Sequence, residues 1–144
     1  MIKGIIFDLD DTLTIHEDLY NKNYLKTICK FFPDLKIPNE EVLQIIISVV
    51  DKIGTKKYFK KYFKTVKFGG RDLLWGDCGG SGDIPEYTKN IQSDLRNEVW
   101  NEIIDNLGEK TDVKTSKIIS YYIEIMWKGI KVFDDVIETL QYLS

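Results

Sequence analysis

Apolar residues recur every three or four positions through most of the chain, which is typical of helices that bury one face in a core. Proline or glycine follows three of these patterns, at Pro33, Gly108 and Gly129, where a helix is expected to end. Residues 45–50 are rich in Ile and Val, so a strand there remains an alternative. The pattern predicts helices over 19–32, 39–53, 55–67, 86–107, 115–128 and 135–143.

Two segments break the helical pattern. Gly4-Ile5-Ile6-Phe7 is a short apolar run that Asp8 stops, as in a strand buried on both faces of a parallel sheet. The polar residues 8–13 then form a loop at the carboxyl end of this strand, where open α/β sheets bind ligands. Residues 68–83 contain six glycines and predict a long loop between helices.

Composition excludes several classes of protein. The 144 residues are 43% hydrophobic and 30% charged, which is ordinary for a globular chain. A net charge of -3 gives no overall attraction to nucleic acid or to an anionic membrane, and no apolar run is long enough to cross a bilayer. The two cysteines, Cys29 and Cys78, are too few for a disulfide scaffold and predict reduced thiols in the cytoplasm.

The acidic loop carries the chemistry that the sequence offers. A carboxylate at Asp8 can bind a hard cation such as Mg²⁺ and can also attack phosphorus. A second carboxylate at Asp10 can protonate a leaving oxygen and then activate water. The Thr12 hydroxyl and the amides of the turn can hold phosphate oxygens.

The run Phe7-Asp8-Leu9-Asp10-Asp11-Thr12-Leu13 resembles the first motif of the haloacid dehalogenase (HAD) superfamily, an apolar strand followed by D-x-D-x-T. The resemblance implies that Asp8 is the nucleophile, that Asp10 is the general acid and base, and that both ligate Mg²⁺. It also implies that Leu9 and Thr12 contact the phosphate group. An acid at position 10 favours phosphate transfer over cleavage of carbon–halogen bonds.

The same resemblance implies a fold class and a domain organisation. The expected fold is an α/β, Rossmann-type HAD core with a mostly α-helical cap, and the chain content is expected to be mainly α. Residues 1–15 would hold the first core strand and the catalytic loop, 16–128 the cap, and 129–144 the return into the core. Arg71, in the glycine-rich loop, would meet a substrate anion if this loop sets specificity; a plain surface loop is an equal alternative.

Three further motifs of the family, a Ser or Thr, a Lys and one or two acids, have no clear counterpart. Asp134 and Asp135 follow an apolar stretch and could imitate the acidic motif, but a helix cap explains them better. Lys128 could be the lysine, although a lysine that ends a helix needs no such role. We therefore expect the front portion of a longer protein, or a core completed by a second copy or a separate chain.

These observations predict a Mg²⁺-dependent phosphohydrolase that acts on a small phosphorylated metabolite through an aspartyl-phosphate, with no nucleic-acid or membrane partner. The alternative is a non-enzymatic helical interaction module, or an inactive fragment that keeps a relict HAD loop.

Overall fold

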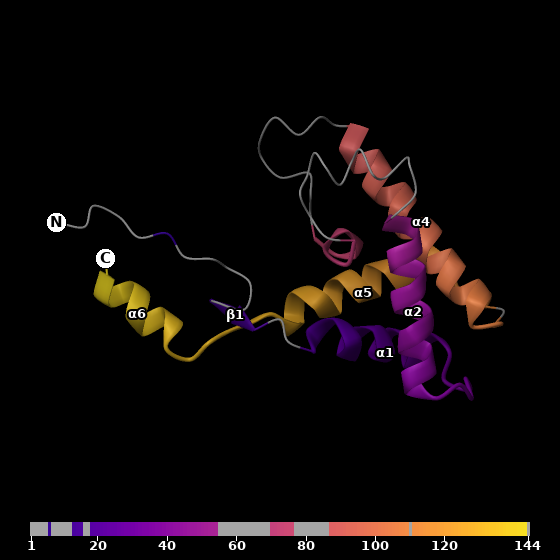
Figure 1. Ribbon diagram of the computed structural model, residues 1–144, viewed down its shortest axis with the longest axis horizontal. Coiled ribbons are helices and arrows are strands. Elements are labelled where there is room, and N and C mark those ends of the chain that lie inside the picture. The colour runs from indigo at the N-terminus through magenta and orange to yellow at the C-terminus, as the bar shows by residue number, and fades with distance from the viewer. Residues whose placement is uncertain are drawn as a thin grey trace.

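The computed structural model describes residues 6, 13–15, 18–54, 70–76, 87–109 and 111–143. Four long helices dominate this part of the chain, and two very short strands and a terminal helix lie beside them (Figure 1). The long helices are α1 (Leu19–Phe31), α2 (Asn39–Gly54), α4 (Tyr87–Asn106) and α5 (Thr115–Gly129). The remaining elements are β1 (Thr14–Ile15), the 3-10 turn η1 (Asp72–Leu74), β2 (Lys131–Val132) and α6 (Val136–Leu143).

The four long helices pack into one unit, called here the helical body. Helix α1 packs against α5 and α2, and α4 packs against the same two helices, so α1 and α4 occupy opposite corners. Figure 1 shows α1 and α5 side by side, with α2 and α4 crossing them steeply. The α1–α5 pair is antiparallel, because Asn23 donates to the carbonyl of Ile125 (3.3 Å) and Phe31 meets Tyr121 at the other end (ring centroids 5.7 Å apart).

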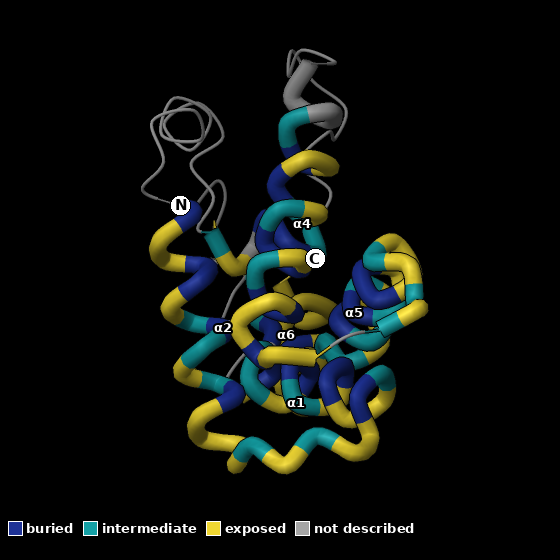
Figure 2. The backbone as a smooth tube through the Cα atoms, turned by 90° about the vertical axis from the view of Figure 1, so that its right-hand side faces the viewer, coloured by how far each residue is buried: buried dark blue, intermediate teal, exposed yellow. Residues whose placement is uncertain are grey.

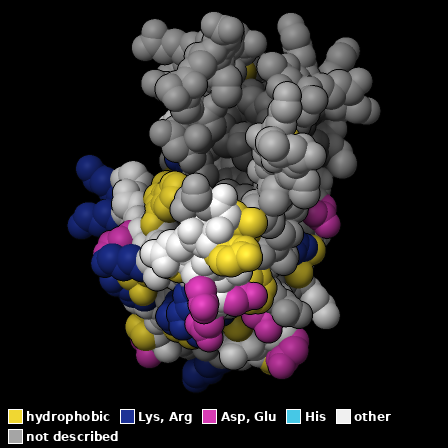
Figure 3. Space-filling model, turned by 90° about the vertical axis from the view of Figure 1, so that its left-hand side faces the viewer, with side chains coloured by type: hydrophobic (Ala, Val, Ile, Leu, Met, Phe, Trp, Pro, Cys, Tyr) yellow, Lys and Arg dark blue, Asp and Glu magenta, His cyan; other side chains and the backbone are white. Residues whose placement is uncertain are grey.

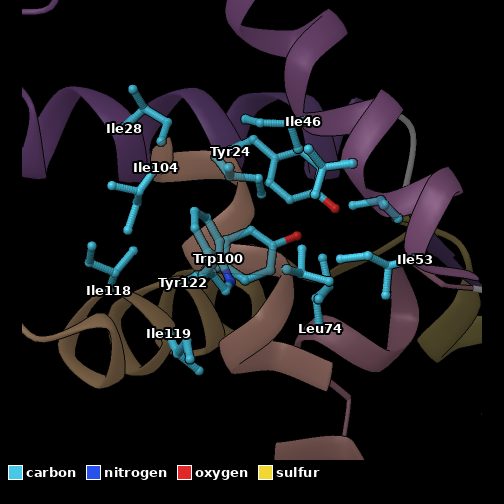
Figure 4. Close-up of a cluster of buried hydrophobic side chains, with 14 of the residues drawn as sticks. Tyr24, Ile28, Ile46, Ile53, Leu74, Trp100, Ile104, Ile118, Ile119 and Tyr122 are labelled. Carbon is cyan, nitrogen blue, oxygen red and sulfur yellow. The ribbon is translucent and has the colours of Figure 1, made fainter. Parts of the chain in front are cut away.

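Aromatic side chains fill the centre of the helical body (Figure 4). Tyr24 of α1 stacks on Tyr122 of α5 with ring centroids 5.1 Å apart, and Trp100 of α4 meets Tyr122 edge-on at 5.2 Å. All three side chains are almost completely buried. Such rings contribute large buried areas and favour the edge-on and offset geometries seen here. Ile46 and Ile53 of α2 close this core from the remaining side.

Most of the helix predictions from the sequence are confirmed. The Ile- and Val-rich segment 45–50 is helical, because Ile46, Val49 and Val50 are buried together with residues one helical turn away. Helix α4 ends before Gly108, whose φ of 70° is the left-handed conformation that glycine adopts at low cost. The predicted helix over 55–67 lies outside the described residues.

Part of the predicted glycine-rich loop is an element of the core. Leu73 and Leu74, in η1, are fully buried. Gln92 and Arg96 of α4 each donate two hydrogen bonds to the carbonyls of Leu73 and Gly76, at 2.6–3.1 Å. Leu73 and Leu74 are therefore core residues, whereas Arg71 is exposed. The choice between a specificity loop and a plain surface loop stays open.

The chain enters and leaves the helical body at one place. Strands β1 and β2 pair in antiparallel fashion, with Thr14 opposite Val132 and Ile15 opposite Lys131. The N–H of Phe133 also donates to the carbonyl of Leu13 at 3.3 Å. We call residues 13–15 and 131–133 the neck. It lies close to the predicted domain boundaries at 15/16 and 128/129, which remain predictions.

The predicted α/β, Rossmann-type fold class is wrong for the described part of the chain. A Rossmann-type sheet is parallel and has helices as crossovers between its strands. The described residues contain only the two-residue antiparallel pair of the neck. Of the predicted strand over 4–7 only Ile6 is described, and it belongs to no strand and is fully exposed. The accompanying expectation of mainly α content agrees with the structure.

Helix α6 follows the neck and keeps most of its apolar side chains on the surface. Val136 is buried, whereas Ile137, Leu140, Tyr142 and Leu143 are 40–88% exposed. Figure 2 accordingly colours α6 mostly as exposed, in contrast to the buried inner faces of the helical body. Figure 3, seen from the side on which α6 lies, shows hydrophobic side chains on the surface.

Candidate functional site

The residues of the predicted catalytic loop, Asp8, Leu9, Asp10 and Thr12, lie outside the described residues. The described chain resumes at Leu13, the last residue of the motif, and continues directly into β1. Their assignment as nucleophile, acid and base, phosphate ligands and metal ligands therefore stays a prediction from the sequence.

The neck fixes the point at which this loop meets the helical body. The carbonyl of Leu13 accepts a hydrogen bond from Phe133, and Thr14 is buried opposite Val132. Backbone pairing of this kind holds two segments about 5 Å apart. Leu13, the residue that follows Thr12, is therefore hydrogen-bonded to the segment that leaves the helical body.

Arg71, the predicted contact for a substrate anion, is exposed at the start of η1. Its carbonyl accepts a hydrogen bond from Leu74 (3.2 Å). Trp75, four residues on, meets Trp127 with ring centroids 5.1 Å apart. Because Trp127 lies in the last turn of α5, residues 70–76 sit beside the end of α5 from which β2 emerges. Asp8 and Asp10 lie outside the described residues, so the predicted meeting of Arg71 with the substrate of this loop stays a prediction.

Gln92 and Arg96 are the residues that sequence reasoning missed. They lie one turn apart on α4, and their side chains point to the same pair of carbonyls, those of Leu73 and Gly76. Hydrogen bonds from a charged donor are stronger than those from a neutral donor. The two bonds from Arg96 are therefore expected to stabilise residues 73–76 more than the two from Gln92. The signal in the sequence was the apolar triplet Leu73-Leu74-Trp75, which a solvent-exposed loop has no reason to contain.

The substitutes considered for the missing family motifs, Lys128, Asp134 and Asp135, are all exposed. Lys128 forms an ion pair with Glu124, one turn earlier on α5. This hydrogen bond raises the pKa of Lys128 and lowers the pKa of Glu124, with nearby Lys30 adding to the second effect. Asp134 and Asp135 are exposed in the turn before α6, and the carbonyl of Asp135 accepts a bond from Thr139. Within the described ranges, no group of three or more His, Cys, Asp or Glu side chains could hold a metal ion.

Two surface grooves open on the described part of the helical body, and neither contains a predicted site residue. The first, of about 420 Å³, lies between α1 and α5 and is lined by Lys30, Phe31, Ser116, Lys117, Ser120, Tyr121 and Glu124. Lys30 places its ammonium 3.7 Å from the centre of the Tyr121 ring, a cation–π contact. The second, of about 470 Å³, lies at the turn between α4 and α5.

Comparison with other proteins assigns no family to the chain. None of the described helices is long and apolar enough to cross a membrane. No protein-family model, curated protein or solved structure matches the sequence.

Proposed function

We propose that the protein is a Mg²⁺-dependent phosphohydrolase of the HAD superfamily that acts on a small phosphorylated metabolite. The observation that carries the proposal is the complete D-x-D-x-T motif, with Asp8, Asp10 and Thr12 in place after an apolar run. A turn without function has no need for this combination of two acids and a hydroxyl at fixed spacing.

The proposed reaction has two steps. In the first, a carboxylate oxygen of Asp8 attacks phosphorus, and the bond between phosphorus and the ester oxygen breaks. The carboxylic acid of Asp10 donates its proton to the leaving oxygen, so the alcohol leaves uncharged. The product on the protein is an aspartyl-phosphate at Asp8.

In the second step, the Asp10 carboxylate takes a proton from water, and the resulting hydroxide attacks phosphorus. Inorganic phosphate leaves, and the Asp8 carboxylate and the Asp10 acid are regenerated. Thr12 and the loop amides hold the phosphate oxygens during both steps. Mg²⁺, which the all-oxygen donors of Asp8 and Asp10 suit, would supply the positive charge that a phosphate dianion needs beside a carboxylate.

In this proposal the helical body has the role of a cap. The neck ties the residue that follows Thr12 to the segment leaving α5. Residues 70–76, with Arg71 exposed, lie beside the same end of α5. A body attached in this way can act as a cap next to the catalytic loop.

The test is Mg²⁺-dependent hydrolysis of a generic phosphomonoester by the 144-residue chain and by the variants Asp8→Asn and Asp10→Asn. Asp11→Asn is the matched control, because Asp11 carries the same charge within the same loop and has no assigned role. We expect Asp8→Asn to lose turnover at least about 10³-fold while Asp11→Asn retains it, since the nucleophile is removed only in the first.

A binding measurement covers the case in which the isolated chain does not turn over. Mg²⁺ should raise the thermal midpoint of the wild type and of Asp11→Asn, but not that of Asp8→Asn, because a ligand stabilises only the state that binds it. Equal shifts in all three proteins, or none, would remove the assignment of Asp8 and favour the interaction-module alternative.

We also propose the cytoplasm as the location of the protein. Cys29 is an exposed free thiol, which a reducing compartment preserves. Cys78 lies outside the described residues.

A further inference from the structure

Trp127, in the last turn of α5, keeps a large aromatic surface in contact with solvent. The residue is 55% exposed, whereas Trp100 is completely buried in the centre of the helical body. Tryptophan is on average among the more buried residue types, because its indole ring carries a large apolar area. Packing of the core therefore accounts for Trp100 but leaves most of the Trp127 ring without a role.

The exposed ring of Trp127 has an aromatic neighbour on residues 70–76, and the same segment carries a cation. Trp75 meets Trp127 edge-on, with ring centroids 5.1 Å apart and an angle of 76° between the ring planes. Arg71 is exposed, and its side chain forms no hydrogen bond or ion pair with any described residue. Its guanidinium can therefore donate to a ligand. We call Arg71, Trp75 and Trp127 the indole surface.

The segment that contributes two of these three side chains is fixed to the helical body. Leu73 and Leu74 are fully buried, and α4 donates four hydrogen bonds, of 2.6–3.1 Å, to the carbonyls of Leu73 and Gly76. A backbone that is already held in place loses less conformational entropy when a ligand binds to its side chains. The indole surface is therefore better prepared for binding than the side chains of a free loop would be.

The indole surface lies at the end of the helical body that carries the neck. Helix α5 runs from the turn of Trp127 directly into β2 (Figure 1). Phe133, six residues after Trp127, donates a hydrogen bond to the carbonyl of Leu13, and Leu13 follows Thr12 in the sequence. In the proposed reaction the phosphoryl group passes to Asp8, so the alcohol part of the substrate extends away from this loop. The end of the body at the neck is the part of the cap next to it.

We infer that the indole surface binds a planar ring in the leaving group of the substrate, which makes a nucleoside monophosphate the substrate class. The inference rests on the proposed function. The base stacks on the open part of the Trp127 ring, an interaction that every base can form because every base has a π-face. Arg71 donates hydrogen bonds to acceptor atoms on the edge of the base, as guanidinium groups do in base recognition. A phosphomonoester without a base gains neither contact.

The test compares adenosine monophosphate (AMP) with ribose 5-phosphate, which carries the same phosphate on the same sugar but has no base. Titration calorimetry on the 144-residue chain without Mg²⁺ measures both affinities while the proposed reaction does not proceed. The wild type should bind AMP at least about 10-fold more tightly than ribose 5-phosphate. Trp127→Ala should weaken AMP binding at least about 5-fold, Trp127→Phe should retain most of the affinity, and neither should change ribose 5-phosphate binding. Arg71→Gln should also weaken AMP binding alone.

The matched control is Tyr142→Ala, which removes an aromatic ring that is 88% exposed on α6, outside the indole surface, and should leave both affinities unchanged. Absent AMP binding, equal affinities for AMP and ribose 5-phosphate, or equal losses in Trp127→Ala and the control would each overturn the inference. A chain with turnover that depends on Asp8 but with no preference for AMP would overturn this inference and leave the proposed function standing. AMP binding that depends on Trp127, in a chain that shows neither turnover nor stabilisation by Mg²⁺, would support ring binding by the indole surface and count against the phosphohydrolase alone.

Discussion

The helical body and α6 have the same kind of sequence pattern but opposite burial. Apolar residues of the body, such as Ile46, Ile103 and Ile118, are fully buried. In α6, apolar residues also recur at helical spacing, yet Ile137, Leu140 and Leu143 are 40–55% exposed. All the exposed large hydrophobic side chains among the described residues lie in α6, in the neck segment before it, at Trp127 or at Ile6.

This difference shows what an amphipathic pattern establishes and what it leaves open. The pattern predicts a helix with an apolar face, and both regions are helical. It does not state where the partner of this face comes from. Four helices of 13–20 residues supply partners for one another, whereas the eight residues of α6 bury only Val136.

The largest expected effect contrasts one residue from each region. Trp100→Ala should destabilise the protein by about 3–5 kcal/mol, because it opens a cavity among Tyr24 and Tyr122. Leu140→Ala should change the free energy of unfolding by less than about 0.5 kcal/mol, because Leu140 is 40% exposed and loses little burial. Urea unfolding followed by circular dichroism measures both. A cost for Leu140→Ala close to that of Trp100→Ala would mean that α6 is packed as firmly as the body.

An intermediate effect would show whether residues 70–76 belong to the body. Arg96→Ala removes two hydrogen bonds to the carbonyls of Leu73 and Gly76 and should cost about 1–3 kcal/mol. Asn97→Ala is the matched control, since the exposed Asn97 side chain bonds to the carbonyl of Ser93 in its own helix and to no other described residue. The same urea titration measures this effect. An Arg96→Ala protein as stable as the control would mean that these hydrogen bonds do not help to hold residues 70–76 against the helical body.

The smallest effect lies near the boundary between the two regions, at the pair of Glu124 and Lys128. The pKa of Glu124 is lowered, so its contribution to stability is present above its ordinary pKa of 4.5 and is lost as the pH falls through the lowered value. The pKa of Lys128 is raised, so its contribution persists up to 10.5 and is lost as the pH rises through the raised value.

Lys128→Gln should therefore lower the thermal midpoint at pH 7 by no more than about one degree, because both side chains are exposed. The difference should shrink as the pH falls below 4.5 and through the lowered pKa of Glu124, because the carboxylate then accepts a proton. Calorimetry at pH 7 and over an acid series below pH 4.5 measures this, with Lys114→Gln as the control on an exposed lysine that forms no ion pair among the described residues. A difference that persists unchanged to the acid end of the series would exclude the ion pair as its cause.

The sequence was sufficient for the helices because their signals are local. The three- to four-residue repeat, the proline after α1 and Gly108 after α4 each act within a few residues of the helix that they define. The burial of Leu73 and Leu74 could not be predicted in the same way. It depends on Gln92 and Arg96, which lie 16–23 residues away and become neighbours only once α4 is packed.

The candidate site was predicted from a motif, and the catalytic loop of this site lies outside the described residues. Asp8, Leu9, Asp10 and Thr12 rest on the sequence alone, whereas Arg71 is described and exposed. The α/β fold class failed because it was implied by a resemblance that is specific over only a short motif, residues 7–13. A sheet is defined by pairing between distant segments, and the only pairing described is the antiparallel contact of β1 with β2.

The neck has a practical consequence for protein engineering. Because Thr14 faces Val132 across a backbone pair, the two ends of a unit of more than 110 residues lie about 5 Å apart. This spacing is that of the two strands entering an ordinary β-hairpin turn. The four helices are therefore suited to transplantation: they could replace the turn of a hairpin in an unrelated host without forcing the host strands apart. Joining the two ends through a short peptide would equally allow new termini to be opened in a surface turn of the body.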